Sequence, residues 1–112
     1  MKHIAVIYHS AHGNTEHFAR HVMAGARSVP DTEVSLLKAE DLSRDPDQLL
    51  AFDGFIWGSP TYLGGVSGPF KSFMDSTGRL WRTHQLKGKL AAGVPVSALP
   101  SGDKQSTLLS MF

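Results

Sequence analysis

The chain has 112 residues, of which 41% are hydrophobic and 19% charged, so it is long enough for one globular domain and its composition is not that of a disordered protein. Its net charge of +1 argues against a nucleic-acid-binding surface, and the absence of cysteine excludes a disulfide framework and thiolate chemistry. Because no stretch approaches membrane-spanning length and the first residues show no signal-peptide pattern, we expect a soluble cytoplasmic protein without membrane insertion.

The N-terminal part predicts a strand, a polar loop and a helix. Residues 4–8 form an uncharged apolar run, which is typical of a parallel strand buried on both faces. Small and polar residues follow at 10–15, and residues 14–27 have helical periodicity, with an apolar stripe of Phe18, Ala19, Val22, Met23 and Ala26. Such a loop points unpaired N–H groups and the positive end of a helix dipole at one place, where a phosphate group would fit.

Two shorter elements are predicted next. β-Branched and aliphatic residues at 32–37 indicate a second strand. Asp45 offers an N-cap acceptor, Pro46 lacks only an N–H that would stay unpaired, and Gln48 stands at the capping-box position. We therefore expect a short helix that ends near Phe52.

The middle of the chain predicts a third strand, a second loop and another helix. Residues 53–59 are apolar in their middle, and residues 60–65 contain a glycine pair that permits backbone conformations closed to other residues. The next helix is expected to begin at 67–69 and to stop at Gly78, with an apolar stripe of Phe70, Phe73 and Met74.

The C-terminal part completes an alternation of strands and helices. After a connecting segment at 79–88, residues 89–96 indicate a fourth strand, residues 97–102 a third loop of small residues, and residues 103–112 the start of one more helix. This alternation predicts an α/β protein with a parallel sheet and right-handed crossovers. Since the loops after strands one, three and four meet at the carboxyl edge of such a sheet, we expect them to line one crevice.

Several motifs resemble one family of flavoproteins. Tyr-His-Ser-Ala-His-Gly-Asn-Thr at 8–15 resembles the phosphate loop of flavodoxin-like proteins, and Gly-Ser-Pro-Thr-Tyr-Leu-Gly-Gly at 58–65 resembles their second flavin loop. Together with residues 73–78, 80–81 and 88–93, these motifs are similar to the WrbA-like NAD(P)H:quinone oxidoreductases of the flavodoxin-like superfamily. The resemblance spans nearly the whole chain. It implies FMN as cofactor, NAD(P)H as reductant, and two-electron reduction of a quinone or a similar acceptor.

The resemblance also assigns site residues. The loop that matches the FMN phosphate site contributes Ser10, Ala11, His12, Gly13, Asn14 and Thr15. The residues that match the ribityl and isoalloxazine site are Pro60, Thr61, Tyr62, Leu63 and Gly64, with Ser97 and Ala98 from the third loop. Backbone N–H groups near the ring would stabilise the charge of reduced flavin, so no catalytic side chain is predicted. Trp81 matches a tryptophan on the substrate side of the flavin, where an aromatic wall holds a flat quinone or nicotinamide.

Some of these assignments have alternatives. Tyr62 stands where many family members have arginine, and it either stacks on the cofactor or packs as an ordinary loop aromatic. Trp81 either contacts the substrate, from the same or a neighbouring subunit, or anchors the segment 79–88. The loop at 10–15 is an ordinary capped turn in the alternative reading, but the agreement of the other two loops favours a phosphate site.

The C-terminal end differs from the family pattern. Family members continue through a fifth strand and a final helix, so residues 1–112 are predicted as a single flavodoxin-like domain that is truncated relative to the family. The expected strand order is 2-1-3-4, with the fifth strand and last helix missing or supplied elsewhere. Pro95 in strand four cannot donate to a ladder and therefore fits an edge strand. Either another subunit covers the apolar face beside the first helix, giving a homo-oligomer (dimer or tetramer), or the chain is a fragment.

Other functions remain open beside the leading one. A flavodoxin that carries electrons on FMN has the same fold, but such carriers are usually strongly acidic. A non-catalytic remnant of the fold would bind little flavin. His17 and His21 are four residues apart, a spacing that zinc ligands use, but no acidic partner is evident, so we predict two solvated side chains and no metal site.

Overall fold

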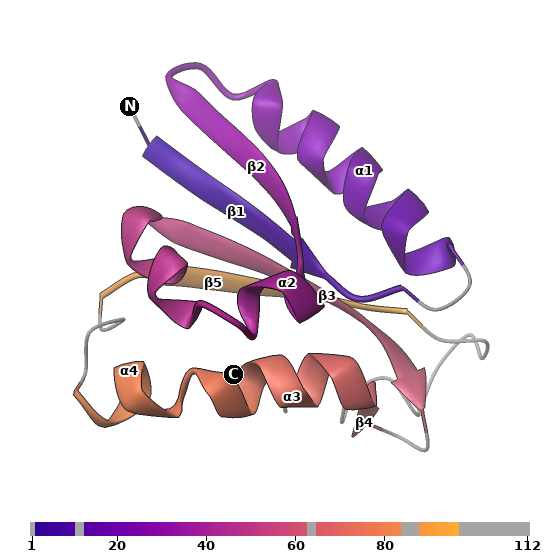
Figure 1. The fold of residues 1–112 in the computed structure, drawn as a ribbon. Helices are drawn as coiled ribbons and strands as arrows, with labels where there is room; N and C mark the ends of the chain where they lie inside the picture. The colour runs from indigo at the N-terminus through magenta and orange to yellow at the C-terminus, as the bar shows by residue number, and fades with distance from the viewer. Residues whose placement is uncertain (1, 11–12, 63–64, 84–87, 97–112) are drawn as a thin grey trace.

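The computed structural model describes residues 2–10, 13–62, 65–83 and 88–96. Strands and helices alternate along the chain (Figure 1). In order, they are β1 (Lys2–Tyr8), α1 (Asn14–Arg27), β2 (Thr32–Lys38), α2 (Ala39–Leu42), the 3₁₀ helix η1 (Pro46–Ala51), β3 (Gly54–Tyr62), β4 (Gly65–Val66), α3 (Gly68–Ser76), α4 (Gly78–Arg82) and β5 (Leu90–Val96). None of the helices in these ranges is long and apolar enough to span a membrane.

Four strands form a parallel sheet in the order β2-β1-β3-β5. Ile4 of β1 lies opposite Val34 of β2 on one side and Gly54 of β3 on the other. The short β4 pairs antiparallel with the end of β3. Counting only the parallel strands, this is the predicted 2-1-3-4 order, so the predicted fold class is confirmed.

Helices cover both faces of the sheet, with α1 on one face and α2, η1 and α3 on the other (Figure 1). The alternation of β1 divides its buried side chains between them: Ala5 and Ile7 belong to the core on the α3 side, and Val6 and Tyr8 to the core on the α1 side. The α3-side core also contains Leu42, Leu49, Phe55, Phe70, Phe73 and Leu80. Burial on both faces explains why the β1 sequence is apolar without alternation.

Helix α1 has the predicted bounds, but the prediction that Phe18 belongs to its buried apolar stripe is wrong. Ala19 is 5% exposed and packs on the sheet, whereas Phe18 is 51% exposed. Val22, Met23 and Ala26 pack against the same core as Ala19. Adjacent residues are about 100° apart on a helix, so Ala19 faces the strands and Phe18 is turned toward the edge of the contact.

The connection between β2 and β3 differs from the prediction. It contains the four-residue α2, which was not predicted, and η1 is a 3₁₀ helix. Asp45 makes no side-chain capping bond. Its backbone carbonyl accepts from the N–H of Gln48 at 3.3 Å, and its carboxylate lies 3.5 Å from the side-chain amide of Gln48. The tight turn brings the two side chains together, so the carboxylate is not used as a cap.

The segment from β3 to α4 corrects the predicted second loop. β3 continues through Tyr62, where Thr61 pairs with Val66 and Tyr62 with Gly65 of β4. The segment predicted as a loop is therefore mostly a hairpin. Ser67 caps α3 as expected, and α3 ends at Ser76, but Gly78 already begins α4 and does not adopt a positive φ.

β5 is an edge strand in the described part of the sheet, since it pairs with β3 alone. Pro95 lies in β5 opposite Ser59, as its missing N–H led us to expect. The predicted third loop and last helix, residues 97–112, lie outside the described residues.

Candidate functional site

The start of α1 and the residues before it, 10–15, form the predicted phosphate site, called the anion loop below. Gly13, in the left-handed conformation at φ 91°, is the N-cap and provides no side-chain acceptor. The first backbone bond of the helix runs from the N–H of His17 to the carbonyl of Gly13 at 3.0 Å. The N–H groups of Asn14, Thr15 and Glu16 therefore have no place in the helix pattern and are available to a ligand.

Two hydroxyl groups flank these N–H groups. Ser10 Oγ accepts a hydrogen bond from the N–H of Gly13 at 3.0 Å, which leaves its own hydrogen free to donate. Thr15 is 3% exposed, and its hydroxyl makes no hydrogen bond within the described residues. Thr15 is the second residue of α1, so its hydroxyl lies in the first turn beside these N–H groups. A set of hydroxyl and amide donors without a cation fits the phosphate of a nucleotide such as FMN.

A carboxylate in the first turn of α1 is held by its neighbours. Glu16 accepts from the Tyr8 hydroxyl at 3.0 Å and lies 3.4 Å from Nε of Arg20. The hydrogen bond from Tyr8 is the main reason that the pKa of Glu16 is lowered, with Arg20 contributing further. Burial is the main reason that the pKa of Tyr8 is raised, followed by the bond to Glu16. Glu16 therefore stays ionised, with its charge directed at Tyr8 and Arg20.

The carboxyl ends of the strands meet beside this loop. Tyr8 lies opposite Gly58, and the N–H of His9 donates to the carbonyl of Gly58 at 3.1 Å. Pro60 of β3 lies opposite Val96, the last residue of β5. The structure thus brings the start of α1 and the ends of β3 and β5 to one edge of the sheet, and a flavin crevice at this edge stays a prediction.

The individual predicted residues fall into three groups. Ser10, Gly13, Asn14 and Thr15 lie in the anion loop, and Pro60, Thr61 and Tyr62 lie in β3 beside it. Ala11, His12, Leu63, Gly64, Ser97 and Ala98 lie outside the described residues. Trp81 lies in α4, which follows the end of α3 that is distant from β4 (Figure 1). The role of Trp81 on the substrate side of the flavin stays a prediction.

A buried polar group at this edge was missed by the sequence interpretation. His9, Ser59 and Ser67 are 8%, 0% and 0% exposed, and Nδ1 of His9 lies 2.8 Å from Oγ of Ser67. The signal in the sequence was a polar residue directly after each apolar run, together with a serine before Gly-Pro at a helix start. His17 and His21 are both exposed with ring centroids 4.6 Å apart, and no three metal-binding side chains gather within the described ranges.

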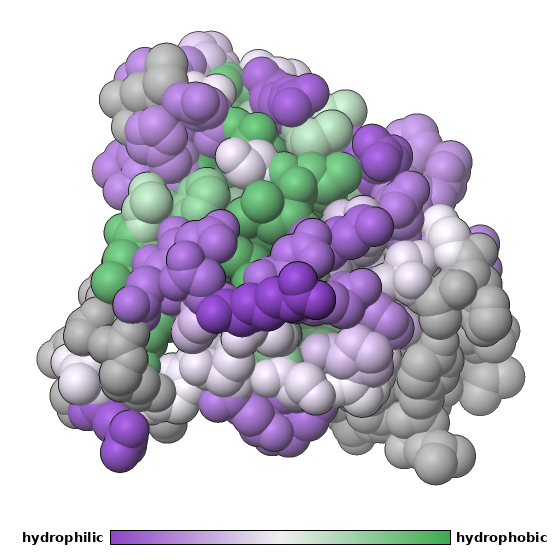
Figure 2. Space-filling view, viewed as in Figure 1, coloured by the Kyte–Doolittle hydropathy of each residue, from purple (hydrophilic) through white to green (hydrophobic). Residues whose placement is uncertain are grey.

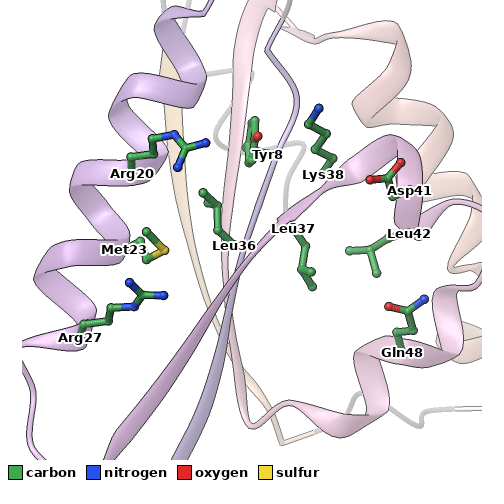
Figure 3. A pocket seen from close by; sticks show the side chains of 10 residues that line it. All are labelled: Tyr8, Arg20, Met23, Arg27, Leu36, Leu37, Lys38, Asp41, Leu42 and Gln48. Carbon is green, nitrogen blue, oxygen red and sulfur yellow. The ribbon is translucent and has the colours of Figure 1, made fainter.

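A cavity of about 620 Å³ lies beside β2 and extends to the carboxyl ends of β1 and β2, where Tyr8 and Lys38 line it (Figure 3). Arg20, Met23 and Arg27 of α1 face Leu36 across one part of it, and Asp41 and Gln48 line the other side of β2. Apolar surface gathers in the same region between α1 and β2 (Figure 2). Charged and apolar side chains line this cavity, and its described lining residues include none from the predicted flavin loops. We therefore assign no cofactor to it.

A parallel sheet in the 2-1-3-4 order, with a glycine-capped helix start after its first strand, defines a flavodoxin-like α/β protein. The chain is 36% identical to an NAD(P)H dehydrogenase (quinone) of Archaeoglobus fulgidus, over all of this chain and 70% of that protein. It is 34% identical to a protein of the same description from Acidithiobacillus ferrooxidans, over 98% of this chain and 64% of that protein. The structure is similar to that of a WrbA-like protein from Agrobacterium tumefaciens, with a TM-score of 0.84 and 32% identity over 98% of this chain and 69% of that one.

The chain belongs to the NADPH-dependent FMN reductase family, whose sequence pattern it matches over residues 2–109. It spans between 59% and 70% of the length of the curated relatives that it matches.

Proposed function

We propose that the protein is an FMN-dependent oxidoreductase that reduces quinones or similar acceptors by two electrons, with NAD(P)H as the reductant. The observation that carries this proposal is the uncapped start of α1, where Gly13 leaves three backbone N–H groups beside the hydroxyls of Ser10 and Thr15. Family membership and the descriptions of the relatives as NAD(P)H dehydrogenase (quinone) support the same activity.

The chain's own residues would bind and orient the cofactor. Bound FMN supplies the redox chemistry, receiving electrons from NAD(P)H and passing them to the acceptor. Ser10, Thr15 and the N–H groups of residues 14–16 would hold its phosphate. Backbone groups of residues 60–62 would lie along the ribityl chain and ring, because β3 continues beyond the end of β1 and pairs there with β4. No titrating side chain is needed in this scheme.

The phosphate assignment is tested by the double variant Ser10→Ala with Thr15→Ala. We expect FMN affinity to fall at least about tenfold, since each hydroxyl donates to a charged group. FMN binding is measured by quenching of flavin fluorescence, and turnover by NAD(P)H-driven quinone reduction.

Ser28→Ala with Thr32→Ala is a matched control. Both of these hydroxyls donate to nearby backbone carbonyls at the opposite end of α1. Unchanged FMN affinity in the Ser10/Thr15 variant would contradict the phosphate site. A purified protein that is colourless and takes up no FMN would contradict the proposed function as a whole.

We further propose that the protein acts as a homo-oligomer in the cytoplasm and that residues 1–112 form one flavodoxin-like domain. An apolar groove of about 370 Å³ runs along β3 and β5 beside the end of α1, lined by Ile4, Ala26, Val29, Ile56, Leu90 and Ala92 among others. A second subunit on this groove would remove exposed apolar surface from water.

A further inference from the structure

The buried polar group of His9, Ser59 and Ser67 joins three elements at the carboxyl edge of the sheet. His9 directly follows β1, Ser59 lies near the end of β3, and Ser67 is the N-cap of α3. Ser59 and Ser67 are fully buried and His9 is 8% exposed. Because His9 immediately precedes Ser10 and its N–H is bonded to Gly58, the group lies beneath the proposed phosphate loop.

The hydrogen bonds of this group form a connected chain. Nδ1 of His9 lies 2.8 Å from Oγ of Ser67, and the N–H of Ser67 donates to Oγ of Ser59 at 3.0 Å. Ser59 Oγ also lies 2.9 Å from the carbonyl oxygen of Pro60 and 3.4 Å from Ser67 Oγ. The N–H of Phe70 donates to Ser67 Oγ at 3.4 Å, which is the capping bond of α3.

These distances favour one of the two possible positions of the histidine proton. Each serine has one hydroxyl hydrogen. The shorter contact of Ser59 is with the Pro60 carbonyl, and the shorter contact of Ser67 is with Nδ1 of His9. When both hydroxyls donate along their shorter contacts, Nδ1 of His9 is an acceptor. The neutral imidazole then carries its proton on Nε2.

The Nε2 atom of His9 is not used by the hydrogen bonds within this group. The imidazole of His9 makes no further hydrogen bond among the residues that the structure describes. His9 is 8% exposed, so the residue keeps some contact with the surface at this edge. His9 thus offers one donor at the edge where the ends of β1 and β3 meet, and the rest of its ring is fixed by burial and by Ser67.

We propose that His9 is a further cofactor-binding residue, fixed by Ser67 as the Nε2–H tautomer so that this N–H donates to an oxygen of the phosphate or ribityl part of FMN. This inference rests on the proposed function. Ser67 and Ser59 are positioning residues in it, because they act on the cofactor only through the imidazole. The arrangement links the loop that holds the phosphate to the first turn of α3.

The donor role is tested with two variants of His9. In His9→Asn the side-chain amide can still bond Ser67 but does not extend to the position of Nε2, whereas in His9→Gln a polar group reaches that position. We expect FMN affinity to fall about two- to tenfold in His9→Asn and less in His9→Gln. Riboflavin, which lacks the phosphate, is titrated in parallel. A loss confined to FMN places the contact at the phosphate, and an equal loss for both ligands places it at the ribityl chain.

His3→Asn is the matched control, because His3 is an exposed histidine at the opposite end of β1. If the wild-type protein binds FMN and His9→Asn binds it with the same affinity, the donor role of His9 alone is overturned. Wild-type protein that binds no FMN overturns the proposed function as well.

The tautomer is tested without cofactor and without a variant. In the ¹⁵N spectrum of the histidine side chains of the wild-type protein, we expect His9 to show a protonated Nε2 and an unprotonated Nδ1 at neutral pH. Ser67→Ala removes the hydroxyl that donates to Nδ1 of His9. This variant should therefore also populate the tautomer with the proton on Nδ1. A His9 signal with its proton on Nδ1 in the wild type overturns the proposal, even where the His9 variants fail to fold.

Discussion

At the scale of single residues, the first turn of α1 combines a site for an anion with a carboxylate of its own. An acidic side chain at a helix N-terminus competes with a phosphate for the same positive potential. Both oxygens of Glu16 are engaged, one by the Tyr8 hydroxyl at 3.0 Å and one by Arg20 at 3.4 Å. The pair of Tyr8 and Arg20 therefore lets Glu16 support the helix while the N–H groups remain available.

Tyr8→Phe should change the pH dependence of stability at both ends of the range. The pKa of Glu16 is lowered below its ordinary 4.5, so its interaction contributes stability above about that pH and loses it as pH falls through the folded-state pKa. The pKa of Tyr8 is raised above its ordinary 10.0, so its contribution is present below that pH and is lost as pH rises through the folded-state pKa.

Without the hydroxyl, both dependences should weaken, and the pKa of Glu16 should move up toward its ordinary value. Urea unfolding from pH 3 to pH 11 and NMR titration of the Glu16 carboxyl measure the two effects, with Glu33→Gln as a control for an exposed carboxylate. An unchanged Glu16 titration in Tyr8→Phe would show that the hydrogen bond does not determine its pKa.

At the scale of elements, two neighbouring leucines of η1 allow the cost of lost core packing to be distinguished from a change in helix propensity. Leu49 is fully buried in the α3-side core, whereas Leu50 is 41% exposed. Leu49→Ala should lower the free energy of unfolding by about 2–5 kcal/mol through lost burial and a cavity. Leu50→Ala, which makes the same chemical change in the same short helix, should stay within about 0.5 kcal/mol of wild type. Urea unfolding followed by circular dichroism provides both values, and equal losses would contradict the assigned burial.

Long periodic elements were predicted well, and short ones were not. The bounds of α1 were predicted correctly because its stripe repeats over 14 residues. α2 has four residues, too few to show a period, and its burial of Ala39 and Leu42 depends on contacts with the α3-side core. The end of β3 was predicted as a loop because Pro60 and the glycine pair indicate turns, yet pairing with β4 and β5 extends the strand to Tyr62.

At the scale of the whole molecule, the proposed oligomer can be tested at the groove along β5. Leu90 is 77% exposed and lines this groove. If a second subunit covers it, Leu90→Lys should shift the protein toward monomer in sedimentation velocity, because a charge in an apolar interface is costly to desolvate. Leu50→Lys, on the opposite face of the sheet, should leave the distribution unchanged. A folded wild-type monomer at all concentrations would contradict the oligomer.

The sequence by itself determined the alternation of parallel strands and helices, the bounds of α1 and the fit of Pro95 to an edge strand. These follow from local patterns: unbroken apolar runs, one long helical period, and small polar residues directly after strands. Only the tertiary structure decided that His9, Ser59 and Ser67 share one hydrogen-bond chain, since the histidine and Ser67 are 58 positions apart in the sequence. It also decided that Phe18 is exposed while Ala19 is buried. The physical reason is the same in both cases: hydrogen-bond partners and burial depend on elements distant in the chain, which no local pattern specifies.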